Sequence, residues 1–154
     1  MRDPARVYRE SAVRGASPVG LVVILYEEII RSLRRALDAV QRDQIERRTN
    51  ELSHAIMVIG YLQSVIDYEK GGQIAHSLSN FYNISRTKIL QCSGPGAASL
   101  LEPLAAEFSS YAEAWQQIDR ELSQHQEPEL VAAGPVPAPV MRGSVRSRRP
   151  RVSR

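Results

Sequence analysis

The segment "ELSH", from Glu51 to His54, is the part of this 154-residue sequence that most resembles a chemical motif. A Glu-x-x-His pair on a helix is one half of the di-iron sites found in helical bundles. Such a site needs two of these pairs and two further inward-facing glutamates, but the sequence has one pair. A solvated helix face explains "ELSH" better, so we predict no metal site and no cofactor.

The adjacent glycines Gly71 and Gly72, in "DYEKGGQIAHSLSNFY", raise the question of a phosphate-binding loop. They lack the GxxxxGK[ST] spacing of such a loop, and Lys70 precedes them instead of following. Glycine adopts positive φ without steric cost and often ends helices. We therefore expect Gly71 and Gly72 to form the corner between two helices.

Catalytic groups are otherwise scattered along the chain. The three histidines, His54, His76 and His125, are scattered, and no G-x-S-x-G or Ser-His-Asp pattern is present. The single cysteine, Cys92, has no second cysteine to pair with and is typical of a small buried apolar residue. We predict that the protein is not an enzyme.

Positive charge is concentrated at the C-terminal end. All 17 acidic residues lie at or before Glu129, whereas six of the 20 basic residues follow it, so residues 1–129 carry a net charge of −3. The Pro-, Gly- and Arg-rich segment 127–154 lacks apolar periodicity and is predicted to be disordered. It suggests an alternative function, nonspecific binding of nucleic acid or an anionic surface, although no aromatic residues are interleaved to stack on bases.

No segment predicts membrane insertion. The longest apolar run, "LVVIL" at 21–25, is far shorter than the roughly 18 residues that a membrane span needs. The polar beginning of the chain also lacks the apolar stretch of a signal peptide. We expect a cytoplasmic protein.

Four stretches have the apolar periodicity and end signals of helices. Ser17 and Pro18 predict a helix start, and the last stretch has the clearest seam, with apolar residues spaced three and four apart. Asp43 with Glu46, and Ser99 with Glu102, resemble capping boxes at the starts of the second and fourth helices. The expected helices run from 18 to about 41, from about 43 to the two glycines, from about 72 to 92, and from about 99 to 124.

Long helices with short connections predict an all-α protein, an antiparallel up-and-down four-helix bundle. We place the bundle at residues 17–126, preceded by a flexible or loosely packed N-terminal arm at 1–16 and followed by the tail at 127–154.

The second predicted helix carries more apolar surface than one core stripe requires. Val58, Tyr61 and Val65 form a line displaced by roughly 100° from the main stripe. One explanation is a wide core face that packs against two neighbours. The other is a groove that accepts an amphipathic segment of a partner.

Three segments together resemble the family of flagellin-specific secretion chaperones called FliS. The first is "YRESAVRGASPVGLVVILYEE", which begins at Tyr8, and the second is "IDYEKGGQIAHSLSNFYNIS", which contains the two glycines. The third is "AWQQI", which contains Trp115. The match spans roughly residues 8–120. It departs from the family pattern at residues 83–85 and in the Arg-rich tail.

This resemblance implies a chaperone that binds the C-terminal segment of flagellin, prevents premature polymerisation and delivers the subunit to the type III export gate. It implies no specific nucleic acid partner, and we expect a monomer or weak dimer. Tyr8 matches the family's N-terminal tyrosine, which is implicated in flagellin binding, in an arm that covers or vacates a groove. Tyr26 and Tyr82 are further candidate contacts, with core packing as the alternative for both.

Overall fold

The computed structural model describes residues 3–125 of the chain. In this range its regular elements are all helices, with no strand, which confirms the all-α prediction. The predicted tail at 127–154 lies outside the described residues. The five helices are α1 (Pro4–Val13), α2 (Pro18–Gln41), α3 (Ile45–Ser64), α4 (Tyr68–Leu90) and α5 (Ala97–His125).

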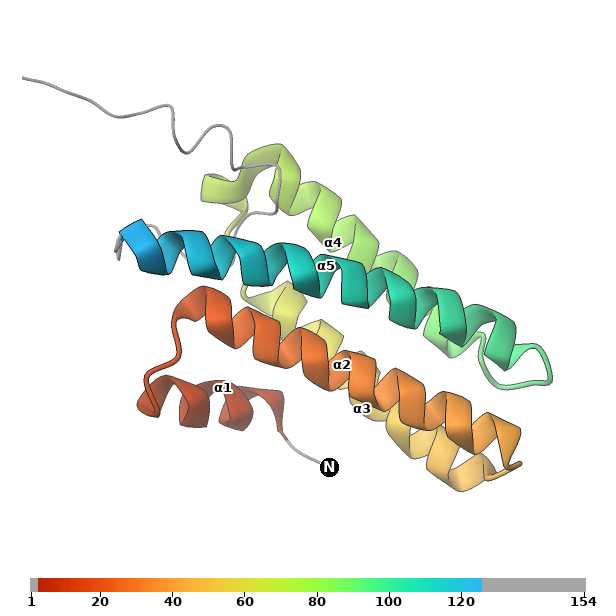
Figure 1. Ribbon diagram of the computed structural model, residues 1–154. Coiled ribbons are helices and arrows are strands. Elements are labelled where there is room, and N and C mark those ends of the chain that lie inside the picture. Colours follow the sequence, from red (N-terminus) through yellow and green to blue (C-terminus); the bar gives the residue numbers. More distant parts are fainter. Residues whose placement is uncertain (1–2, 126–154) are drawn as a thin grey trace, which may run out of the picture.

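Helix α2 is the central element of the fold. It packs along α5 on one side and along α3 on the other, while α4 contacts α3 and α5 (Figure 1). The apolar face predicted for α2 is the buried one, and Leu25, Ile29 and Leu33 have at most 1% of their surface exposed. This face is wide because two helices cover it.

The start of α2 is fixed by a serine that makes two hydrogen bonds. The side-chain oxygen of Ser17 accepts a bond from the backbone N–H of Gly20 at 2.9 Å, as an N-cap residue does. Its hydroxyl also donates to Oδ1 of Asp119 on α5 at 2.5 Å. Ser17 therefore caps α2 and ties this end of α2 to α5.

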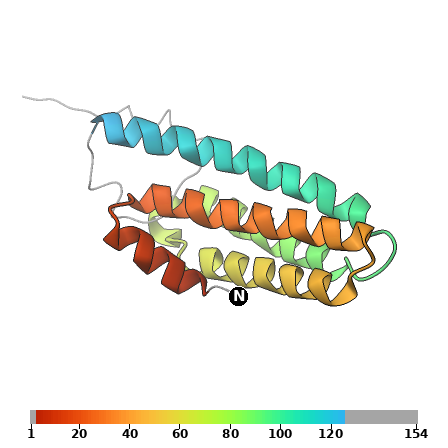
Figure 2. The same cartoon turned by 60° about the horizontal axis from the view of Figure 1, so that its bottom comes forward.

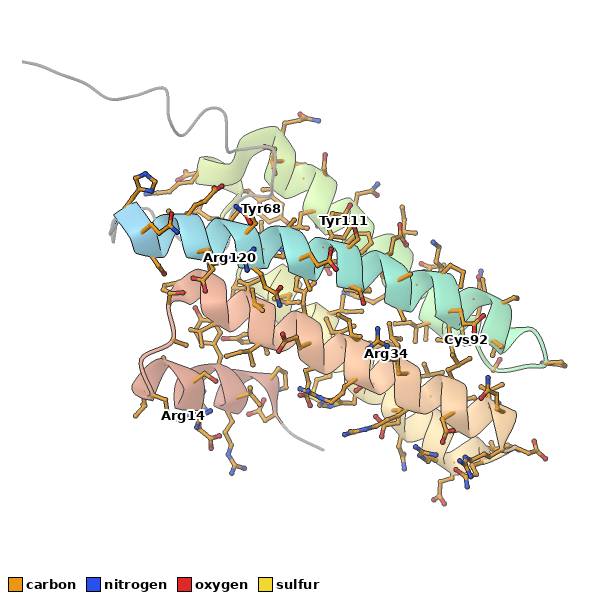
Figure 3. All side chains as sticks on the ribbon, in the orientation of Figure 1. Arg14, Arg34, Tyr68, Cys92, Tyr111 and Arg120 are labelled. Carbon is orange, nitrogen blue, oxygen red and sulfur yellow. The ribbon has the colours of Figure 1, made fainter. Side chains whose placement is uncertain are left out.

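Aromatic rings join α2, α4 and α5 in the core. Tyr26 lies 5.5 Å from Phe108 and 6.3 Å from both Tyr82 and Trp115, measured between ring centroids. At the edge of this cluster, Phe81 of α4 lies 4.5 Å from Tyr111 of α5, which is labelled in Figure 3. The seam predicted for the last helix is thus confirmed as core, since its Leu101, Leu104, Phe108 and Trp115 have at most 1% exposure.

The N-terminal segment differs from the predicted arm because residues 4–13 form α1. The carboxylate of Asp3 accepts a hydrogen bond from the N–H of Ala5, and Pro4 occupies the first helical position. Val7, 5% exposed, packs into the core, and α1 lies against α2 and α3 (Figure 2). The prediction missed α1 because a helix of ten residues gives a short periodic signal.

Two helix starts also differ from the predicted capping boxes. Asp43 adopts a left-handed φ of 57°, and α3 begins after Gln44 without a side-chain cap. Helix α5 begins two residues before Ser99, whose hydroxyl donates to the carbonyl of Gly96 at 2.8 Å. In both places the turn geometry of the connection sets the helix start.

The corner between α3 and α4 lies earlier than the glycines. Helix α3 ends at Ser64, and Asp67 caps α4 by accepting a hydrogen bond from the N–H of Lys70 at 3.0 Å. Gly72 then has a φ of 53° and a ψ of −129° inside α4, a conformation that is costly for any residue with a side chain. Gly72 therefore bends α4 after its first turn.

Candidate functional site

The part of α3 that follows Glu51 has a surface without charged residues. No Asp, Glu, Lys or Arg occurs between Glu51 and Asp67, although part of this stretch faces solvent. The exposed and half-buried residues on the solvent side define what we call the outer face of α3. They are Ser53, Ile56, Met57, Gly60, Tyr61 and Ser64. Solvent-facing helix surfaces are normally charged or polar, so this face resembles a docking surface more than a solvated one.

Met57 and Gly60 give the outer face of α3 its particular shape. Met57 has 40% of its surface exposed, and a Cβ built on Gly60 would find no atom within 4 Å. Glycine in a helix interior costs about 0.5–1 kcal/mol relative to alanine. No neighbour within the described residues requires a glycine at position 60, whereas a partner helix could approach the backbone closely there.

Helix α1 covers one edge of this face. The ring of Tyr8 meets the ring of Tyr61 edge to face, with 5.8 Å between centroids. Burial raises the pKa of Tyr61 above its ordinary value. The attachment of α1 is small because its large apolar contacts come mainly from Val7 and Tyr8.

A polar network covers the opposite edge, where α3 meets α4. The Nε2 group of Gln63 donates to Oγ of Ser79 and to Oδ1 of Asn83, each at 2.9 Å. Arg86 in turn donates to Oε1 of Gln63, and the hydroxyl of Tyr68, labelled in Figure 3, donates to Ser79. The outer face of α3 is therefore bounded by an apolar edge at α1 and a polar edge at α4.

The predicted contact residues fall into two groups. Tyr8, Tyr61 and Val65 are half-buried, and Tyr8 and Tyr61 meet at the α1 edge. Val58 has no exposed surface and packs in the core, as the interpretation of this line as a wide core face predicted. Tyr26 and Tyr82 are likewise buried.

The two buried tyrosines bond to each other. Their hydroxyl groups are 2.7 Å apart, in the centre of the aromatic cluster. Burial raises the pKa of Tyr26 to about 12, and burial together with Tyr26 raises the pKa of Tyr82 well above its usual range. Both act as core residues that join α2 to α4.

A buried polar pair connects α2 to α3. Glu28 and His54 are 8% and 6% exposed, and Nε2 of His54 lies 3.1 Å from Oε2 of Glu28. Arg31 donates to the other carboxylate oxygen at 2.9 Å. Burial alone would raise the pKa of Glu28, but the hydrogen bonds from Arg31 and His54 outweigh it and hold that pKa below its ordinary value.

The second ring nitrogen of His54, Nδ1, is buried and has no hydrogen-bond partner among residues 3–125. A buried polar atom left unpaired costs about 1–3 kcal/mol. His54 is the histidine of the "ELSH" pair, so the prediction of a solvated helix face is wrong at this residue, which is buried and has Glu28 of another helix as its partner. Within the described range, no group of three or more His, Cys, Asp or Glu side chains is placed to hold a metal ion.

Sequence reasoning missed the outer face of α3 because it followed apolar residues and not the absence of charge. The uncharged stretch between Glu51 and Asp67 was the available signal. Met57 and Gly60 lie on neither apolar line of the helix, so periodicity alone does not select them.

Among the described helices, none is long and apolar enough to cross a membrane.

Comparison with known proteins identifies the family. Residues 1–122 match the family model described as flagellar protein FliS. The chain belongs to the FliS family. Its match includes α1, the outer face of α3 and most of α5, and it confirms the resemblance to this family.

Several curated relatives of this FliS-family chain are named flagellar secretion chaperones. A protein with that name from Salmonella typhimurium is 35% identical over 120 residues, which cover 77% of this chain and 89% of the relative. FliSB of Pseudomonas aeruginosa is 27% identical, covering 77% and 94%. The protein from Vibrio cholerae is also 27% identical, covering 79% and 92%.

Proposed function

We propose that this protein is a cytoplasmic flagellar secretion chaperone that binds the C-terminal segment of flagellin. In this role it prevents premature polymerisation and helps to deliver flagellin to the type III export apparatus, in contact with components of the export gate. Family membership and the names of the relatives support the chaperone role. The observation that carries the binding proposal is the uncharged outer face of α3.

The chemistry of this face suits an amphipathic partner. Met57, Ile56 and Tyr61 offer apolar contacts, and methionine adapts its shape to different partners. A flexible segment that folds into helices on binding gains affinity from such contacts. Part of that affinity is offset by the conformational entropy that the segment loses on folding. Binding is therefore strong enough to block self-association of the partner, and release at the export apparatus stays accessible.

The remaining helices supply the scaffold in this proposal. Helices α2–α5 act as an antiparallel four-helix bundle that holds α3 rigid, and the aromatic cluster around Tyr26 fixes three of the four helices to one another. Helix α1 is the mobile element. Because its attachment relies on Val7 and the Tyr8–Tyr61 contact, a partner helix competes with it at modest cost.

Calorimetric titration with a flagellin C-terminal peptide tests the proposal. We expect saturable one-to-one binding, weakened at least tenfold by Met57→Glu, since this substitution places an unpaired charge in an apolar interface. Ile84→Glu is the matched control because Ile84 has a similar exposure, 47%, but lies on α4. Both variants should melt within a few degrees of the parent.

Two results would contradict the proposal. Absence of saturable binding to the unmodified protein would exclude flagellin as the partner. Equal effects of Met57→Glu and Ile84→Glu would instead remove the outer face of α3 as the binding surface.

A further inference from the structure

The buried polar pair lies on the same side of α3 as the residue that α1 contacts. His54, Val58, Tyr61 and Val65 are spaced 4, 3 and 4 apart, so they share one side of the helix. Tyr61 meets Tyr8 of α1. His54 lies two turns before Tyr61, about 10 Å along the axis. It therefore lies on the side of α3 that bears Tyr61, beyond the fully buried Val58.

The hydrogen bonds of the pair fix the orientation of the imidazole ring. Glu28 has both carboxylate oxygens engaged, one with Nε2 of His54 and the other with Arg31. An ionised carboxylate only accepts hydrogen bonds, so Nε2 carries the proton. When the ring is neutral, Nδ1 is an acceptor held in a fixed position, although no described residue donates to it.

The other buried unpaired atom does not share these properties. The Nε1 group of Trp115 has no hydrogen bond of good geometry within residues 3–125, but it interacts with the Tyr26 hydroxyl in the aromatic cluster that joins α2, α4 and α5. That cluster is the centre of the core. His54 is the one of the two that lies on the side of α3 where a helix already docks and where we propose exchange.

We propose that Nδ1 of His54 is a polar anchor that accepts a hydrogen bond from a hydroxyl or primary amide side chain of a partner helix. The inference rests on the proposed function, since the partner helix takes the place of α1 on α3. Such a bond would be made in the complex only, so it would favour one register of the partner helix. A cationic partner group is disfavoured because the carboxylate of Glu28 is already balanced by Arg31.

Two substitutions at His54 test the roles of its two ring nitrogens independently. His54→Gln keeps an amide near the position of Nε2, where it bonds Glu28, and removes the acceptor at Nδ1. His54→Asn keeps a polar atom near Nδ1 and removes the bond to Glu28. We expect His54→Gln to weaken binding of the flagellin C-terminal peptide about tenfold and His54→Asn to weaken it less. His76→Gln, at an exposed position on α4, is the control and should bind as the parent does.

Peptide substitutions identify the donor without altering the chaperone. Each Ser, Thr, Asn and Gln of the peptide is changed to alanine and titrated against the parent protein and against His54→Gln. We expect one peptide position to lose about tenfold against the parent and to lose nothing further against His54→Gln. Such non-additivity is the signature of a direct contact.

Three outcomes would overturn the inference. If the parent binds the peptide but the losses are additive at every peptide position, Nδ1 of His54 is not an anchor, and the proposed function is unaffected. Non-additive losses between His54→Gln and an Asp or Glu of the peptide would show that the ring of His54 is charged and donates from Nδ1. Failure of the parent to bind the peptide would overturn the proposed function and this inference together.

Discussion

Replacing Tyr82 by phenylalanine removes one hydroxyl from the centre of the core. Tyr82 and Tyr26 are 1% and 0% exposed, and their hydroxyl oxygens are 2.7 Å apart. After Tyr82→Phe the hydroxyl of Tyr26 stays buried and loses this partner. The cost of leaving such a group unpaired is about 1–3 kcal/mol, whereas removing both hydroxyls is close to neutral. The double variant Tyr26→Phe/Tyr82→Phe should therefore be more stable than the sum of the single variants predicts.

Urea unfolding followed by circular dichroism measures this difference. With a typical slope of about 1–3 kcal/mol per molar urea, Tyr82→Phe should lower the midpoint by roughly 1 M. The double variant should recover most of that loss. A Tyr82→Phe midpoint within the error of the parent, or strictly additive effects of Tyr26→Phe and Tyr82→Phe, would refute the argument that this hydrogen bond couples α2 to α4.

The same pair predicts a loss of stability at alkaline pH. An unfolded tyrosine ionises near pH 10, but the pKa of Tyr26 in the fold is about 12 and that of Tyr82 is also raised. The unfolded chain therefore releases these protons first, and the free energy of unfolding falls as pH rises above 10. The double phenylalanine variant should lose less stability than the parent over this range.

Three further substitutions test other parts of the fold. Glu28→Gln should destabilise the protein at pH 7 and much less at pH 3. The pKa of Glu28 is held below its ordinary value, so its contribution is present above about pH 4.5 and is lost as pH falls through the folded value; urea midpoints at the two pH values measure it. Gly72→Ala should cost about 1–3 kcal/mol, seen as a lower melting temperature, because alanine does not tolerate this backbone geometry. Gly60→Ala should instead raise the melting temperature, since its Cβ meets open space and alanine favours a helix; a lower value would show a packing role for Gly60.

The long helices were predictable because their signals are local and agree with one another. Helix α2 runs from Pro18 to Gln41 as predicted, with Ser17 as cap. The seam of α5 was predictable because a spacing of three and four over about six turns has no competing explanation. The start of α3 was not, because Asp43 takes a left-handed turn instead of capping.

The candidate site was less predictable because burial depends on what packs above a residue. The line through Val58, Tyr61 and Val65 has one apolar pattern, yet Val58 is fully buried and its two neighbours on the line are half-buried. The ring of Tyr61 packs against Tyr8 of α1, and α1 itself was not predicted. The partner of His54 was likewise hidden, since Glu28 is distant in sequence and on another helix.

The two bonds of Ser17 determine how movement at the N-terminus is transmitted. Gly15, with a φ of 94°, and Ser17 both lie in the short connection from α1 to α2. Because Ser17 is fastened to Gly20 and Asp119, rotation of the backbone at Gly15 would swing α1 while leaving α2 clamped to α5. Gly15 would then act as a hinge and Ser17 as a fixed point, so that exchange of α1 for a partner leaves α2–α5 in place. Binding and release of the partner would therefore leave the stability of the four remaining helices unchanged.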